Sequence, residues 1–177
     1  MRFTPTKLAG AFVIDPVRHE DERGWFTRTF CTEEFAACGL PVVFPQHNVS
    51  FNRRRGTLRG LHYQTAPYEE PKVVRCVRGA IFDAIVDIRP GSATWGKWVA
   101  YELDADNGRA LYVPPGFAHG FQTLADDSEV LYLMGQQYAP GHAAGIRYDD
   151  LSIGLAWPLP PTVISERDLA FPAITRT

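Results

Sequence analysis

Residues 80–88 read Ala-Ile-Phe-Asp-Ala-Ile-Val-Asp-Ile, and this stretch decides the fold class. Side chains alternate between the two faces of a β-strand, so every even position here falls on one wholly apolar face, which we expect to pack in a core. The opposite face carries Ile81, Asp83, Ile85 and Asp87. Two carboxylates among isoleucines fit either the wall of a cavity, where each charge needs a partner, or an ordinary solvent face. The stretch therefore predicts a strand with one core face. Its second face is either a cavity wall or a solvent face.

The rest of the chain repeats this pattern in short runs, punctuated by Gly, Pro, Asn and Asp. Only residues 32–37 resemble a helix, which Thr32 can cap and Gly39 can end. Many short strands with so little helix predict an all-β protein, an antiparallel sandwich or barrel. The predicted strands are 11–16, 24–30, 42–50, 57–64, 72–78, 80–88, 97–103, 109–113, 120–123, 129–136 and 146–148.

Length and composition limit the classes of function. The 177 residues fit one domain, 1–177, and the net charge of −2 provides no field for nucleic acid or an anionic membrane. The basic residues 53–55 form either a solvated turn or a site for a phosphate of a small ligand. Three cysteines without Cys-x-x-Cys spacing, with no signal segment and no membrane span, indicate a reduced cytoplasmic protein.

One candidate for acid–base chemistry is His62, in the stretch Leu-Arg-Gly-Leu-His-Tyr-Gln at residues 58–64. Glycine two residues earlier leaves space against the imidazole ring, as a ligand pocket needs. A core histidine satisfied by a neighbour is the equal alternative. Arg59 has the opposite strand parity, so it shares a cavity with His62 only if Gly60 marks a β-bulge.

His119 is the second candidate, because the turn Pro-Pro-Gly at residues 114–116 aims it into a following strand. A metal site would need a second histidine two residues after His62 and a nearby glutamate. Position 64 is instead glutamine, and the next glutamates, Glu69 and Glu70, lie in a proline-flanked loop. The sequence therefore favours acid–base chemistry over a facial metal triad.

Three other polar residues carry little information singly. Tyr132 alternates with apolar residues, so filling the core is its default role. Lys72 opens a strand, where most lysines reach solvent. Asp168 follows Ser165 at the start of a short helical turn that we expect to close near a site. The preceding residues 156–161 are rich in proline and predict a strap across the surface.

Taken together and in order, these motifs resemble the RmlC family, the dTDP-4-dehydrorhamnose 3,5-epimerases of the cupin superfamily. The resemblance implies a β jelly-roll, built as a homodimer, that binds a nucleotide-linked 4-keto-6-deoxy sugar, most simply a dTDP-sugar, without metal or other cofactor. The stretches that carry it span most of the chain: 21–26, 46–50, 58–64, 72–76, 82–89, 115–121, 131–132 and 165–168.

The resemblance also implies roles for individual residues. His62 matches the family's general base, Asp168 the carboxylate that orients it, and Tyr132 the acid on the opposite face of the sugar. Arg23 is expected to reach the substrate from the partner subunit. The positions that match substrate contacts are Arg23, Phe26, Arg28, Gln46, Asn48, Arg59, Lys72, His119, Tyr138 and Arg167.

These roles are chemically coherent. A ketone at C4 acidifies the hydrogens at C3 and C5, and imidazole titrates near neutral pH, as a base for their removal should. Lys72 or His119 can stabilise the resulting enolate, and arginines can grip the diphosphate bidentately. A neutral phenol can return the proton on the other face.

Four positions depart from the family's pattern, although the acid–base residues do not. Arg28 and Ala143 replace glutamates, whereas Arg167 and Leu133 replace lysines, and Leu133 is placed to point away from the cavity. An enzyme that epimerises C3 or C5 alone, or that acts on a CDP- or GDP-sugar, therefore stays an alternative. So do a sugar-binding jelly roll without turnover and a metal-dependent cupin that uses His62 and His119.

Overall fold

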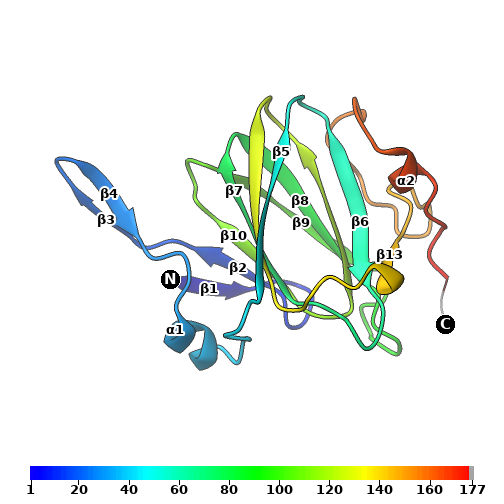
Figure 1. The fold of residues 1–177 in the computed structure, drawn as a ribbon, viewed down its shortest axis with the longest axis horizontal. Coiled ribbons are helices and arrows are strands. Elements are labelled where there is room, and N and C mark those ends of the chain that lie inside the picture. The colour runs from blue at the N-terminus through cyan, green and yellow to red at the C-terminus, as the bar shows by residue number, and fades with distance from the viewer. Residues whose placement is uncertain (176–177) are drawn as a thin grey trace.

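Two antiparallel sheets face each other in the computed structural model, which describes residues 1–175 (Figure 1). The six-stranded sheet has the order β1 (Arg2–Pro5), β2 (Phe12–Asp15), β10 (Ala110–Val113), β7 (Lys72–Arg78), β12 (Ser128–Met134), β5 (Gln46–Asn52). The five-stranded sheet has the order β13 (Ala143–Gly145), β6 (Leu58–Gln64), β11 (Phe117–Thr123), β8 (Ala80–Asp87), β9 (Trp98–Asp104). The predicted all-β, jelly-roll sandwich is confirmed.

A separate hairpin and short helices complete the fold. The hairpin, β3 (Arg18–Asp21) with β4 (Gly24–Thr27), projects away from the sandwich at the left of Figure 1. Helix α1 (Thr32–Ala37) packs on the outer face of the six-stranded sheet through Phe35, which is fully buried. A 3₁₀ turn (Pro140–His142) leads into β13, and α2 (Glu166–Leu169) packs beside β6.

Strand β8 shows how the core is built on both of its faces. Ile81 and Ile85 point between the sheets, where they pack in the main core with Val74 of β7 and Val130 of β12. The even positions form the predicted apolar face, which packs in a second core under the C-terminal strap, against side chains such as Trp157. The strap therefore covers the five-stranded sheet, and β8 has no solvent face.

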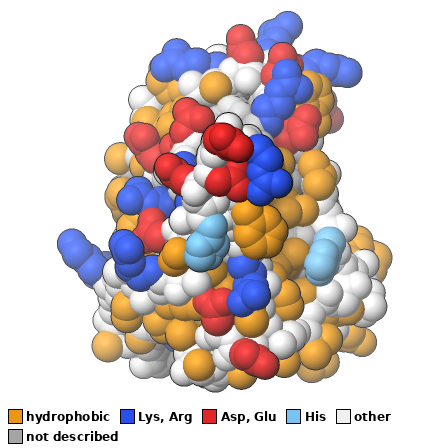
Figure 2. All heavy atoms as spheres, turned by 90° about the vertical axis from the view of Figure 1, so that its left-hand side faces the viewer, with side chains coloured by type: hydrophobic (Ala, Val, Ile, Leu, Met, Phe, Trp, Pro, Cys, Tyr) orange, Lys and Arg blue, Asp and Glu red, His pale blue; other side chains and the backbone are white. Residues whose placement is uncertain are grey.

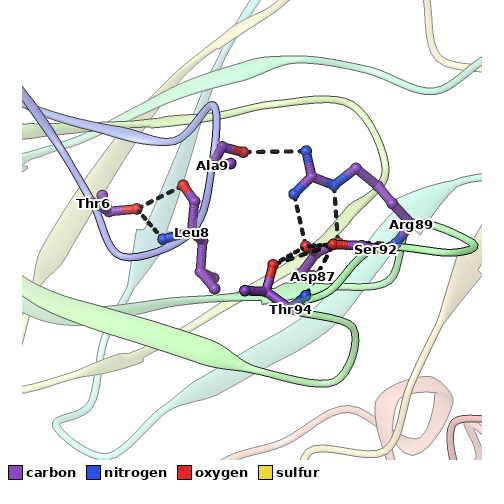
Figure 3. A network of polar contacts seen from close by, with 7 residues as sticks. All are labelled: Thr6, Leu8, Ala9, Asp87, Arg89, Ser92 and Thr94. Carbon is purple, nitrogen blue, oxygen red and sulfur yellow. Dashed lines mark hydrogen bonds and ion pairs between the residues drawn. The ribbon is translucent and has the colours of Figure 1, made fainter.

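Both aspartates of β8 are fully buried, so the interpretation of its second face as solvent-exposed is wrong. Asp87 accepts hydrogen bonds from Arg89, from Ser92 and from Thr94, and Arg89 in turn donates to the carbonyl of Ala9 (Figure 3). This network ties the loop after β8 to the N-terminal loop. Asp83 has a different partner, described with the cavity below.

The structure corrects several local predictions. Helix α1 lies where expected, but Cys31 is its N-cap residue and no side chain caps it, because Thr32 already lies inside the helix. Strand β5 begins only at Gln46, after two prolines that cannot donate ladder hydrogen bonds. Strand β11 begins three residues earlier than predicted, at Phe117, directly after the Pro-Pro-Gly turn.

The other boundary errors concern edges of the sheets. Residues 28–30 leave the predicted strand 24–30, which ends at Thr27 where the hairpin ends. The strand expected at 146–148 is Ala143–Gly145, although Ile146 still exchanges backbone hydrogen bonds with Leu61. Strands β1 and β3 were not predicted. Strand β3 is entirely polar and gives no apolar alternation.

Candidate active site

A cavity of about 520 Å³ opens between the two sheets and gathers most of the predicted site residues. Side chains from β5, β7 and β12 face side chains from β6 and β11 across it. His62 and Tyr132, which sit on opposite sheets, therefore line the same cavity. The predicted residues that line it are Gln46, Asn48, Arg59, His62, Lys72, His119, Tyr132, Tyr138 and Arg167.

His62 is paired with a carboxylate that arrives from the C-terminal segment. Its Nε2 lies 2.8 Å from Oδ1 of Asp168, a residue only 4% exposed. Oδ2 of Asp168 accepts the backbone N–H of Gly60 at 3.0 Å. Ser165 caps α2 as expected, since its hydroxyl accepts the backbone N–H of Asp168. The helical turn thus carries Asp168 to the imidazole.

Burial raises the pKa of the Asp168 carboxyl, but hydrogen bonds from His62 and from the backbone of Gly60, with the attraction of the imidazole, outweigh it. The net pKa lies below the ordinary aspartate value, so Asp168 is ionised at neutral pH. A fixed carboxylate in this position orients an imidazole and stabilises the imidazolium that forms when the ring takes up a proton.

A β-bulge brings Arg59 and His62 to the same side of β6, as the sequence allowed. Strand β11 pairs His119 with His62 and Phe121 with Arg59, so three steps along β6 match two steps along β11. The extra residue reverses the parity, and both side chains line the cavity. The Nε–H of Arg59 donates to the side-chain carbonyl of Asn52 at 2.7 Å, which fixes its direction.

Gly60 serves this bulge by close backbone approach. A Cβ atom at position 60 would lie 2.5 Å from the Cα of Gly120, and its φ of 133° also disfavours other residues. The interpretation that Gly60 leaves open space against the His62 ring is therefore wrong. The ring of Phe171 instead packs edge-on against His62, at 5.7 Å between ring centroids.

Tyr132 joins the main core by its ring and the cavity by its hydroxyl. Its ring packs against the core side chains, and its Oη lies 3.1 Å from Oγ of Ser50. Burial raises the pKa of the Tyr132 phenol far above its usual value, and the hydrogen bond with Ser50 only partly offsets this. Tyr132 is thus a neutral phenol that can act as a proton donor.

His119 and Lys72 each have a buried acidic partner. Nε2 of His119 lies 2.7 Å from Oδ1 of Asp83, which stands behind the histidine and does not itself line the cavity. Nζ of Lys72 lies 3.0 Å from Oε1 of Glu70, and these two side chains are 6% and 7% exposed. The expectation that Lys72 reaches solvent is therefore wrong, because Glu70 compensates its charge inside the cavity wall.

Nearly the whole chain matches a known family. The family described as dTDP-4-dehydrorhamnose 3,5-epimerase matches residues 5–176. The chain belongs to this epimerase family.

Known members of the family resemble this epimerase closely in sequence and fold. The dTDP-4-dehydrorhamnose 3,5-epimerase of Sinorhizobium fredii is 42% identical over 175 residues, covering 98% of this chain and 90% of that protein. The dTDP-4-dehydrorhamnose 3-epimerase of Streptomyces niveus is 37% identical, covering 95% and 81%. The Legionella pneumophila RmlC structure in complex with dTDP-4-keto-L-rhamnose has a TM-score of 0.91 at 35% identity, covering 97% and 92%.

Three predicted substrate contacts of the epimerase lie outside this cavity. Arg23 and Phe26 sit on the projecting hairpin, where the Arg23 side chain is 85% exposed and Phe26 is 71% exposed. Arg28 follows the hairpin and pairs with Glu34 of α1 at 3.3 Å. Figure 2 looks onto this end of the molecule, where basic, acidic and apolar side chains are mixed.

The structure also shows where the positions that depart from the family's pattern lie. Ala143 lines the cavity, so the missing glutamate leaves an apolar patch of wall there. Leu133 lines a different hollow, on the outer face of the six-stranded sheet, so it points away from the cavity as expected. Arg53 and Arg54 are exposed and border a shallow hollow beside Arg59, which leaves both interpretations of the basic cluster open.

Sequence reasoning missed several residues of the site, among them Ser50, Glu70 and Phe171. The sequence indicated Glu70 only as a possible metal ligand. Its position two residues before Lys72 nevertheless places both side chains on one side of an extended chain. Phe171 gives no local signal, because its contact with His62 depends on how the C-terminal segment folds back. Among residues 1–175, no group of three or more His, Cys, Asp or Glu side chains is placed to hold a metal ion. Nor is any helix of the described chain long and apolar enough to cross a bilayer.

Proposed function

We propose that this protein epimerises dTDP-4-dehydro-6-deoxy-D-glucose at C3 and C5. One observation carries the proposal: an imidazole paired with a buried carboxylate faces a neutral phenol across a single cavity. Removal of a proton and its return from the opposite side is how a carbon next to a ketone is inverted. The reaction is redox-neutral, so the proposal assigns no cofactor.

In this mechanism each cavity residue has a distinct task. His62 removes the proton next to the C4 ketone, while Asp168 stabilises the imidazolium. Lys72 and His119 donate hydrogen bonds to the enolate oxygen, a role for donors fixed in a dry site. Tyr132 returns a proton to the opposite face.

The remaining cavity residues bind and orient the nucleotide sugar. Arg59 and Arg167 bind the diphosphate, because a guanidinium group can donate two parallel hydrogen bonds to phosphate oxygens. Gln46, Asn48 and Tyr138 complete the binding wall. We assign Arg23, Phe26 and Arg28 to the nucleotide end, with Arg23 supplied by a partner subunit.

The proposed assembly is a homodimer, supported by an exposed apolar surface. We define the outer face as the side of β5, β7 and β12 that points away from the cavity, with Phe51 44% and Val77 43% exposed. Apolar surface gathered on one sheet face is typical of a protein–protein contact. We further infer a cytoplasmic location, for which three free cysteines provide support.

An epimerase that acts at C3 alone is the second candidate. The Streptomyces niveus relative, named as a 3-epimerase, matches 95% of this chain, and Ala143 changes the cavity wall. The two candidates share the same base and acid. They differ in how many carbons exchange hydrogen with solvent.

Solvent exchange tests the proposal directly. The protein is incubated with dTDP-4-dehydro-6-deoxy-D-glucose in D₂O, and deuterium at C3 and C5 is followed by mass spectrometry and NMR. We expect deuterium at both carbons, or at C3 alone for the second candidate. His62→Ala should slow exchange by about 10²-fold or more, because the base is lost. His142→Ala is the matched control, since His142 lies outside the cavity and pairs with Thr65.

Other outcomes point elsewhere. Tight binding of the nucleotide sugar without exchange would indicate a binding protein. Exchange with a CDP- or GDP-sugar alone would keep the reaction class and change the nucleotide. No exchange with any of these sugars would reject the proposal.

A further inference from the structure

The ion pair between Glu70 and Lys72 is buried in the wall of the cavity that binds the substrate. Both residues line it, and their side chains are only 7% and 6% exposed. Oε1 of Glu70 faces the Lys72 ammonium at 3.0 Å. An ammonium with so little access to water needs a compensating charge, and within residues 1–175 Glu70 is the acidic group paired with it.

Glu70 is itself held from behind. Its Oε2 accepts a hydrogen bond from Nε2 of Gln64 at 2.8 Å, and Gln64 also donates to the carbonyls of Tyr68 and Gln137. The side-chain carbonyl of Gln64 accepts the backbone N–H of Ala139 at 2.7 Å. Gln64 is 4% exposed, so this arrangement is a buried support built on β6.

We propose that Glu70 is a positioning residue of the active site, which acts on the reaction through Lys72. This inference rests on the proposed function, in which Lys72 donates to the enolate oxygen. Glu70 fixes the ammonium at one side and leaves its remaining N–H groups directed to the substrate. Glu70 also keeps the ammonium charge-balanced before the enolate forms.

The physical reason is preorganisation. A donor that already points at the position of the developing negative charge needs no reorganisation during the reaction. Without the carboxylate, Lys72 would be an uncompensated buried cation. It would then turn toward other acceptors, which removes a donor from the enolate.

The first test is Glu70→Gln, which keeps the size of the side chain and removes the charge. We expect kcat for exchange to fall about tenfold to a hundredfold, because the loss falls on the transition state. KM should change less than about threefold, because the ground-state contacts stay. Glu70→Asp keeps the charge and should recover part of kcat. Glu69→Gln is the matched control, because Glu69 is the exposed neighbour in the same loop and should leave kcat unchanged.

The second test separates action through Lys72 from a general effect on the loop. In a Lys72→Met background, adding Glu70→Gln should cost little further activity, because the interaction is already lost. Thermal unfolding of the same variants gives a second double-mutant cycle, in which Tm is measured in place of activity. Glu70→Gln should lower Tm, and the double variant Glu70→Gln/Lys72→Met should recover stability.

Two results would overturn the inference: an unchanged kcat in Glu70→Gln, or an equal loss in both backgrounds. If the wild-type protein exchanges no hydrogen, the proposed function fails. The Tm cycle still reports in that case whether the two residues act as a pair.

Discussion

Tyr132 combines two properties that are usually separate in one residue. Its ring is part of the main core, and its hydroxyl contacts Ser50 at the cavity. Burial raises the pKa of Tyr132, and the charge of Asp83 raises it further, so the phenol is protonated at neutral pH. A residue in this state can give a proton to a carbanion, whereas it is poorly suited to remove one.

Tyr132→Phe should therefore separate exchange from inversion. His62 is intact in this variant, so hydrogen at C3 and C5 should still exchange with D₂O. Formation of the inverted product should fall about 10²–10⁴-fold, because the donor on the opposite face is lost. NMR coupling constants of the sugar product measure the inversion. Tyr112→Phe, at a buried tyrosine outside the cavity, should leave both rates unchanged, whereas normal inversion in Tyr132→Phe would assign the proton to another group.

At the scale of elements, β8 shows how one strand serves both the site and the scaffold. Asp83 near its centre supports His119, whereas Asp87 at its end organises the loop that follows (Figure 3). Burial raises the pKa of Asp87, but hydrogen bonds from Arg89, Ser92 and Thr94 lower it far more. The net pKa lies well below that of a free aspartate, so the charged form contributes to stability.

Asp87→Asn should therefore destabilise the protein in a pH-dependent way. Because the folded-state pKa is lowered, the stabilisation is complete above the ordinary aspartate pKa of about 3.9 and is lost as the pH falls below it. At pH 7 we expect a loss of about 3–5 kcal/mol in the free energy of unfolding, as for other broken buried ion pairs. Denaturant unfolding should show this difference shrinking from pH 5 toward pH 2. Asp149→Asn removes an exposed pair with Arg147 and should cost less than about 1 kcal/mol. A pH-independent difference would contradict the assignment.

How much of this could be predicted from sequence depends on how local each signal is. The β-rich pattern follows from alternation and glycine content over a few residues, whereas the bulge at Gly60 was only a condition under which Arg59 would share the cavity with His62. The capping role of Thr32 failed because a helix boundary shifted by one residue moves the cap. The partners of Lys72 and Asp83 are set by tertiary packing. Strand parity indicates which face of the sheet each side chain occupies, but it does not identify the residue that each side chain contacts. No local sequence rule predicts the contact of Phe171 with His62.

At the scale of the whole molecule, the cavity and the projecting hairpin are separated from each other. Arg23 and Phe26 lie on the hairpin, away from the cavity that the proposed function assigns them to. The outer face, on β5, β7 and β12, carries exposed apolar side chains such as Phe51 and Val77. A homodimer that buries the outer face would explain both features, because a partner's hairpin could then complete each cavity.

Phe51→Asp should therefore weaken the proposed dimer and the activity together. A charge at the centre of an apolar contact opposes association, since its desolvation is not compensated. Sedimentation velocity should show a shift from dimer to monomer, and kcat/KM should fall at low protein concentration and recover at high concentration. Leu151→Asp is the matched control, because Leu151 is 97% exposed in a different part of the surface. A wild-type protein that sediments as a monomer would contradict the assembly.

The partner of His62 comes from 106 positions further along the chain, on the short helix that follows the sandwich. All strands of both sheets precede that helix, whereas the second core also takes in residues of the segment around it, such as Leu155 and Trp157. Docking of this C-terminal segment therefore does two things at once: it covers the five-stranded sheet and it brings the carboxylate to the imidazole. A variant whose C-terminal segment detaches would lose core packing and the charged partner of His62 together.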